Sequence, residues 1–379
     1  MKLCFISSFP PSKGNLAEYG FYLIKEFKKS KLFDSIVVLA NQSNSKKEER
    51  IGKLKIIRCW KQDDFFLPFR ILYRIWKENP DIVHFNLHMM NWGKSKVVNF
   101  LGAVTPLLTK ILLRKKVVIT LHNIVEAVDL EKMNLKKNFL IEIGTYLATK
   151  SLLSVDKVIV TLDFFKRILV KKYKAKNIVT IFHGTFGKKV KRINLNSNKI
   201  LAFGFWREIK NLPLLIEAFS DLKKKYKNLE LIVAGSSHPY FPNYLEEIKK
   251  KYKKVKGIKY LGYVPEKKLD KVFKSSFLIV LPYLTGVGTS GVVHLGVSYG
   301  KPIIASDIPQ IVETTKEEKF KVIFFKNNDK EDLKKQIEWI LKNRKKVRKI
   351  VEENLKISAK NSFSQISKKY LSLFKSLIS

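Results

Sequence analysis

The fold is decided by residues 200–219, which read ILAFGFWREIKNLPLLIEAF. An apolar run at 201–204 is followed by a polar turn, and from Leu212 the apolar residues return at helical spacing. Strand, turn and helix in this order begin a βαβ unit. The turn places two cations, Arg207 and Lys210, between strand and helix, where open α/β sheets bind their ligands. A solvent-exposed loop explains the same two residues equally well.

The same alternation of strand and helix runs along the whole chain. Further strands are predicted at 229–234, 258–262, 277–281, 302–306 and 322–325, and upstream at 3–8, 36–40, 82–85, 117–121 and 157–161. Helices are predicted at 17–29, 69–77, 97–113 and 135–153. Parallel sheets wrapped by helices have this pattern, so the fold class is α/β with two Rossmann-like domains.

The length of 379 residues also favours two domains, because single cores stop growing near about 250 residues. The polar, aperiodic stretch 188–199 is predicted to be the linker. The N-terminal domain then covers 1–187 and the C-terminal domain 188–361, and a last helix-period segment covers 362–379.

The composition points to a globular protein of the cytoplasm. The two cysteines, Cys4 and Cys59, do not suggest a disulfide framework. The apolar stretch at 3–9 is too short for a secretory leader, and that at 100–113 falls short of the roughly 20 residues that span a bilayer.

The net charge of +41 is extreme and suggests a polyanionic partner, either nucleic acid or the anionic face of a membrane. A general lysine bias is the alternative. Five aromatic residues on a basic amphipathic stretch favour a membrane-surface acceptor, although a buried core helix explains them equally well: Phe65, Phe66, Phe69, Tyr73 and Trp76.

A second run, residues 283–294, follows a predicted strand and leads into a predicted helix. Its glycines let backbone approach a ligand, and free N–H groups at a helix start bind phosphate. Thr289 and Ser290 could donate to a phosphate oxygen, while capping of the helix explains them without a ligand. The expected phosphate contacts are Thr289, Ser290, Gly291 and Val292.

Together these motifs resemble the GT-B fold, and specifically the family 4 glycosyltransferases (glycosyl transferases group 1). Arg207 and Lys210 fit the family's Arg-x-x-Lys variant, which implies that they bind the donor diphosphate. The stretch IKYLGYV at 258–264 resembles the family segment that lines the nucleotide base, so Tyr263 and Val264 inherit that role. The resemblance implies two domains facing across a cleft and a C-terminal helix that crosses back to the N-terminal domain.

The resemblance extends to the N-terminal half. Gly14 and Asn15 stand where the family has two glycines that border the donor phosphate and the acceptor, and Asn15 replaces the second. His122 matches a histidine near the transferred sugar, whereas His84 is interpreted as structural.

The main departure is the missing Glu-x7-Glu motif, whose two positions fall at Val287 and Leu295. Glu313 is a candidate replacement for the ribose contact.

The resemblance implies a retaining hexosyltransferase that moves glucose, mannose or an N-acetylhexosamine from a nucleotide-diphosphate sugar to a glycan or lipid-linked acceptor. The absence of an Asp-x-Asp tripeptide predicts a metal-independent enzyme without other cofactors. We expect a cytoplasmic protein, peripheral on the cytoplasmic membrane face. Two alternatives are a non-catalytic glycosyltransferase-like subunit and a basic nucleic-acid-binding protein, although no nucleic-acid motif occurs.

Overall fold

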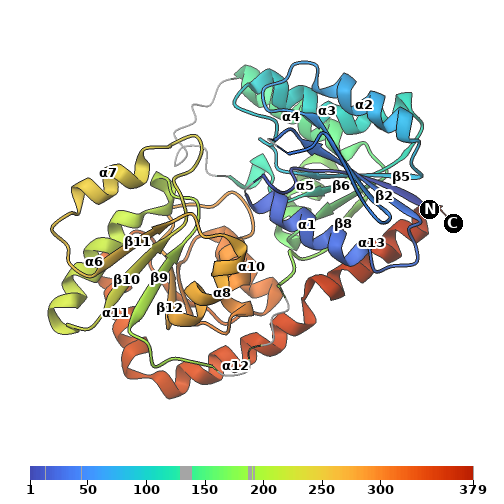
Figure 1. The fold of residues 1–379 in the computed structure, drawn as a ribbon. Coiled ribbons are helices and arrows are strands. Elements are labelled where there is room, and N and C mark those ends of the chain that lie inside the picture. The colour runs from blue at the N-terminus through green and yellow to red at the C-terminus, as the bar shows by residue number, and fades with distance from the viewer. Residues whose placement is uncertain (13, 44, 129–138, 187–189, 191–192, 379) are drawn as a thin grey trace. The chain divides into compact units, whose positions relative to one another are not determined.

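The computed structural model describes all residues except 13, 44, 129–138, 187–189, 191–192 and 379 (Figure 1). The described chain divides into two compact units. Unit 1 contains the described residues of Met1–Val128, Lys136–His183 and Phe363–Ser379, and unit 2 contains those of Gly184–Ser362. The predicted linker at 188–199 follows this boundary, and four of its residues lie outside the described part.

The described residues of unit 1 form an eight-stranded sheet in the order β3-β4-β2-β1-β5-β6-β7-β8. Neighbouring strands run parallel except β3 and β4, which are antiparallel. The strand order turns back at β1, between β2 and β5. The strands are β1 Lys2–Ile6, β2 Ser35–Asn41, β3 Glu48–Ile51, β4 Leu54–Trp60, β5 Ile82–Leu87, β6 Lys116–Leu121, β7 Lys157–Val160 and β8 Ile178–Thr180.

Helices pack on this sheet because their aliphatic sides are buried in its core. They are α1 Asn15–Phe27, α2 Leu67–Glu78, α3 Lys96–Leu112, α4 Phe139–Leu153, α5 Asp163–Tyr173 and α13 Phe363–Ile378, with the short η1 Val125–Ala127. The last of these, α13, lies against α1: Tyr370 Oη is 2.9 Å from Tyr19 Oη, and the Phe374 ring contacts Phe27. The predicted return of the C-terminal helix to the first unit is therefore confirmed.

Unit 2 has a six-stranded sheet among its described residues, in the order β11-β10-β9-β12-β13-β14 with all neighbours parallel. Its strands are β9 Lys199–Phe203, β10 Glu230–Ala234, β11 Ile258–Gly262, β12 Leu278–Leu281, β13 Ile303–Ser306 and β14 Ile323–Phe325. Its helices are η2 Glu208–Lys210, α6 Leu212–Lys225, α7 Tyr244–Lys251, α8 Glu266–Ser275, α9 Gly291–Ser298, α10 Pro309–Glu318, α11 Lys330–Lys342 and α12 Arg344–Lys360. The order turns back at β9, between β10 and β12, and open α/β sheets bind ligands at such a point.

Candidate functional site

The turns after β9, β10 and β12 are held together at the switch point of unit 2. Trp206 N–H donates to Ser236 O at 2.9 Å, and His238 N–H donates back to Trp206 O at 2.8 Å. The buried Trp206 indole donates to Ala234 O at 3.0 Å, and Leu284 N–H donates to Ile209 O at 2.9 Å. These bonds fix the backbone of the turn that carries the two cations.

Glycines allow the strand ends to approach closely. Gly204 and Gly235 have positive φ angles of 151° and 103°, which side chains rarely adopt. A Cβ at Gly235 would lie 1.8 Å from Gly204 O, so neither space nor backbone admits one. Gly235 N–H also donates to Gly262 O at 2.7 Å. Three adjacent strands thus end in glycine at one edge of the sheet.

Arg207 precedes the short η2 turn as its N-cap, and Lys210 is the last residue of that turn. The Lys210 ammonium sits 3.4 Å from the centroid of the Tyr283 ring, a cation–π contact that holds it beside the end of β12. Burial and the neighbouring Arg207 charge lower the pKa of Lys210 to about 7. Lys210 forms no ion pair with the described residues. Its positive charge is therefore not neutralised by a carboxylate of the described chain, and Arg207 adds a second positive charge nearby. Such a site suits a bound polyanion.

The glycine-bearing run ends at α9, whose N-terminus is not capped by a side chain. Ser290 occupies the cap position, but in the described chain its hydroxyl accepts no hydrogen bond from the first turn. The capping explanation of Ser290 therefore does not hold in this structure. An uncapped helix start presents N–H groups of Gly291 and Val292 that can bind an anion.

A buried pair holds α9 to α10. His294 Nε2 lies 2.8 Å from Glu318 Oε1, and His294 Nδ1 lies 2.9 Å from Ser290 O. Burial lowers the pKa of His294, but the Glu318 carboxylate outweighs it and the net pKa is raised. The imidazole is thus positioned to support the first turn of α9.

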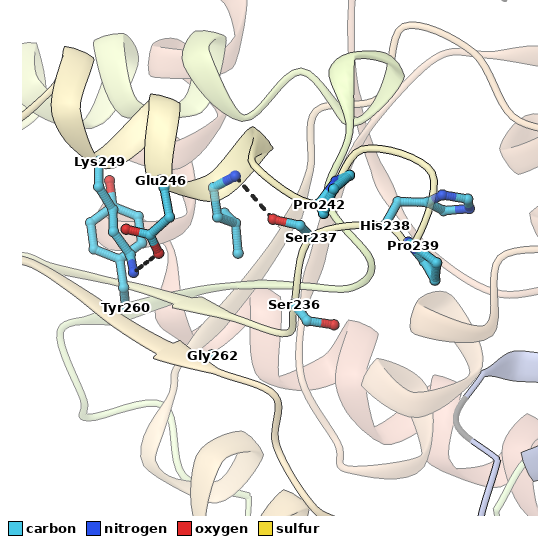
Figure 2. A pocket seen from close by; sticks show the side chains of 10 residues that line it. Ser236, Ser237, His238, Pro239, Pro242, Glu246, Lys249, Tyr260 and Gly262 are labelled. Carbon is cyan, nitrogen blue, oxygen red and sulfur yellow. Dashed lines mark hydrogen bonds and ion pairs between the residues drawn. The ribbon is translucent and has the colours of Figure 1, made fainter. Parts of the chain in front are cut away.

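A cavity of about 300 Å³ opens at the carboxyl ends of β10 and β11 (Figure 2). In Figure 2 Tyr260, Glu246 and Lys249 lie at one end, and His238 and Pro239 at the other. His238 Nδ1 accepts a hydrogen bond from Tyr240 N–H at 3.2 Å, so a neutral imidazole carries its proton on Nε2. Burial, together with the charges of Arg207 and Lys210, lowers the pKa of His238 to about 4. His238 therefore offers an N–H donor near the two cations.

Comparison with known proteins matches residues 185–357 to the family model described as glycosyl transferases group 1. That range contains every residue of the site just described. Unit 2 is a glycosyl transferases group 1 domain. An uncharacterized glycosyltransferase of Haemophilus influenzae is 26% identical over 204 residues, which are 53% of this chain and 55% of that protein. The match thus spans about half the length of this curated relative.

Solved structures resemble the chain over nearly its full length. Sucrose-phosphate synthase of Thermosynechococcus elongatus has a TM-score of 0.77 at 15% identity, covering 99% of this chain and 98% of that one. HepE of Anabaena in complex with UDP-glucose has a TM-score of 0.74 at 13% identity, covering 99% and 100%. A glycosyltransferase of Rickettsia africae has a TM-score of 0.71 at 18% identity, covering 100% and 98%. These likenesses show the fold, and the predicted GT-B fold is confirmed.

The remaining residues predicted for the group 1 domain differ in how exposed their side chains are. Tyr263 follows Gly262 at the edge of the cavity and is exposed, whereas the Val264 side chain is buried in the core. Of the two, only Tyr263 thus has an exposed side chain at this edge. Glu313 is half-buried on α10.

In unit 1 the predicted His122 follows β6 and is nearly buried, at 4% exposure. Asn86 donates through Nδ2 to Ser7 Oγ at 2.9 Å, so its Oδ1 accepts from His122 Nε2 at 2.7 Å. Burial and nearby histidines hold the pKa of His122 well below its usual range. His122 is therefore neutral, with Nδ1 left as its acceptor. His84 is fully buried and lies 2.8 Å from Thr120 Oγ1, as a structural residue would.

The N-terminal loop leads into α1. Gly14 precedes the helix with a φ of 132°, and a Cβ there would meet nothing within 4 Å. The side chain of Asn15, which was predicted to border the donor phosphate and the acceptor, lies outside the described part of the chain.

Sequence reasoning missed Gly235, His238 and the cavity. The signal available was a glycine at the end of, or directly after, each of three predicted strands, at Gly204, Gly235 and Gly262. It becomes informative only when those strands are known to be neighbours.

Proposed function

We propose that the chain is a glycosyltransferase that moves a hexose from a nucleotide-diphosphate sugar to a glycan or lipid-linked acceptor. The observation that carries the proposal is the pair of cations Arg207 and Lys210 in the turn after β9 of a group 1 domain. Lys210 is held against Tyr283 at the end of β12, and the segment that follows leads to the uncapped start of α9. The complex of HepE with UDP-glucose supports a nucleotide-sugar donor for a protein of this fold.

The proposed chemistry is departure of the nucleoside diphosphate with retention at the anomeric carbon. Negative charge develops on the leaving diphosphate, and fixed donors aimed at that charge lower the barrier. Arg207 and Lys210 supply two cations, and Gly291 and Val292 supply N–H groups. Thr289 and Ser290 lie directly before these groups and complete the phosphate contacts.

The nucleoside is proposed to occupy the cavity between the ends of β10 and β11. This placement is supported by the polar side chains that line the cavity, Ser236, Ser237 and His238. It is also supported by the position of the cavity next to Gly262, which directly precedes Tyr263. Glu313 is proposed to contact the ribose. We further propose that His122 contacts the transferred sugar and that Gly14 and Asn15 border it, with the neutral His122 accepting from a hydroxyl through Nδ1.

We propose that transfer needs no metal, because two cations and a helix start can neutralise the diphosphate. The test is thermal stabilisation in EDTA by UDP, GDP, ADP and their sugar conjugates, since a ligand that binds only the folded state raises its melting temperature. We expect one base to produce a clear shift that Mg²⁺ does not increase. No shift with any nucleotide, or a shift that requires Mg²⁺, contradicts the corresponding part of the proposal.

A second candidate is a glycosyltransferase-like subunit without catalysis. Val287 and Leu295 stand where the Glu-x7-Glu glutamates would be, and Leu295 is buried. The two candidates differ in turnover: the enzyme releases nucleoside diphosphate from its donor, whereas the subunit binds the donor and leaves it intact. Chromatography of the incubated nucleotide distinguishes them.

The acceptor is proposed to be at the cytoplasmic face of a membrane, with peripheral attachment of the chain. The charge of +41 supports attraction to anionic lipid. Within the described residues, no helix combines the length and apolarity needed to cross a bilayer.

A further inference from the structure

Helix α2 has two apolar faces, and only one of them is used by the fold. Leu67, Ile71 and Ile75 are fully buried in the core of unit 1. A second set of side chains, which we call the α2 stripe, is between 54% and 70% exposed: Phe65, Phe66, Phe69, Tyr73 and Trp76. The sequence left a core helix and a surface helix as equal explanations of these aromatics. The structure places them on the surface.

The stripe is continuous along the helix. Phe69, Tyr73 and Trp76 are four and three residues apart, which puts them on one side of α2. From Phe66 to Trp76 the helix rises about 15 Å. Large exposed aromatic side chains that are clustered in this way usually mark an interaction site, because monomeric proteins rarely leave a contiguous apolar patch in contact with water.

The charges near the stripe are mainly positive. The single carboxylate within α2, Glu78, is buried in ion pairs with Lys2 at 3.0 Å and Lys55 at 2.6 Å. Lys77 is exposed and, with the described residues, forms no ion pair. Arg70 and Arg74 contact Asp64 at 2.8 Å and Glu48 at 3.3 Å, which neutralises part of their charge.

More cations follow at the C-terminal end of α2. Lys115 Nζ donates to Asn79 Oδ1 at 2.5 Å, and its neighbours Arg114 and Lys116 are exposed. Aromatic side chains flanked by lysine and arginine are typical of helices that lie in the interface of an anionic bilayer.

We propose that the α2 stripe docks this chain on an anionic phospholipid surface, with the helix in the membrane plane. The biological purpose of this docking rests on the proposed function, in which the acceptor is at a membrane. The observations that support the docking are all in unit 1 and are separate from the donor site. Charge complementarity selects lipid as the occupant, because a chain of +41 with basic residues beside the stripe and at its end is attracted to an anionic surface before the rings insert.

Trp76 reports insertion directly. Of the five tryptophans, Trp60, Trp92 and Trp206 are buried and Trp339 is half-buried, so Trp76 is the exposed one. We expect a blue shift of tryptophan emission with vesicles of phosphatidylcholine and phosphatidylglycerol, and none with phosphatidylcholine alone. Trp76→Phe should keep cosedimentation with the anionic vesicles and lose the blue shift.

The deciding variant is Phe69→Ser with Trp76→Ser, compared with Phe139→Ser, a phenylalanine of similar exposure on α4. We expect the double variant to bind anionic vesicles about 100-fold more weakly or worse, since each of the two aromatics contributes on the order of 1.4 kcal/mol or more, which is about tenfold. Phe139→Ser should bind like the parent chain.

Unchanged vesicle binding in the double variant, or no binding by the parent chain, would overturn the docking proposal. So would a dimer in sedimentation that dissociates in the double variant, because it would assign the stripe to a second copy. Nucleotide-induced thermal stabilisation of the double variant checks the donor site separately. If that stabilisation is missing in every form while vesicle binding persists, the proposed function fails and the docking stands.

Discussion

The two units share a topology but differ in what the sequence places at their switch points. In unit 2 the strand ends carry glycines, two cations and an uncapped helix start. In unit 1 the corresponding ends carry a serine, an amide and a neutral histidine, joined as Ser7, Asn86 and His122. We propose that the edge in unit 2 binds an anion and that the edge in unit 1 binds hydroxyl groups. The two units would then differ in ligand because their turns carry different side chains.

The largest expected effect comes from the close approach of Gly235 to Gly204 at the strand ends of unit 2. Gly235→Ala forces a Cβ against Gly204 O at a φ of 103°, and should lower the free energy of unfolding by about 3 kcal/mol or more. The matched control is Gly144→Ala on α4 of unit 1, where nothing lies within 4 Å. It should gain about 0.5 to 1 kcal/mol from helix propensity. Urea unfolding measures both, and equal effects would contradict the packing described.

The next prediction tests whether unit 2 binds the nucleoside diphosphate through Arg207. Arg207→Ala should weaken binding of the preferred nucleoside diphosphate about 10- to 100-fold, because a charge-assisted contact contributes roughly 1.5 to 3 kcal/mol. Arg348→Ala, on α12 of the same unit, removes an equal charge away from the site and should change affinity little. Titration calorimetry compares them. Equal losses would show that net charge, and not the turn after β9, drives binding.

A smaller effect is a proton linkage at Lys210, whose pKa is about 7. At pH 8 the free protein holds Lys210 largely neutral, and a bound diphosphate favours its charged form. Binding should therefore take up nearly one proton at pH 8, and affinity should fall as the pH rises above about 7. Calorimetry in buffers of different ionisation enthalpy counts the proton, and Lys210→Met should abolish the uptake.

The same lowered pKa has a consequence for stability without ligand. Between about pH 7 and the lysine's unperturbed value, the unfolded chain holds a proton on Lys210 that the folded chain has released. The contribution of Lys210 to stability should therefore rise with pH across that window. The parent chain should therefore gain stability relative to the Lys210→Met variant as the pH rises through this window. A parent chain that instead loses stability relative to the variant would contradict the lowered pKa.

Most of the fold was predictable because the buried parallel strands are short apolar runs, such as 36–40 and 278–281, that need no partner to be recognised. The β3–β4 hairpin was not predicted, since β3 reads Glu-Glu-Arg-Ile and is an exposed edge strand. Strand β8, which has only three residues, Ile178–Thr180, was not predicted either, nor was helix α5 after β7.

The candidate site divides in the same way. Arg207 and Lys210 were predicted because they follow a strand directly. His238 was not, because its relation to Arg207 depends on the pairing of β9 with β10. The exposure of the α2 stripe could not be predicted either, since helical spacing is the same for a buried face and an exposed one.

The most direct test of the account is hydrogen–deuterium exchange of the full chain with and without its stabilising nucleotide, in EDTA. We expect slowed exchange in the segments after β9, after β10 and at the start of α9, near residues 204–211, 235–240 and 286–293. Nucleotide binding that protects other segments and leaves these three unchanged would contradict it.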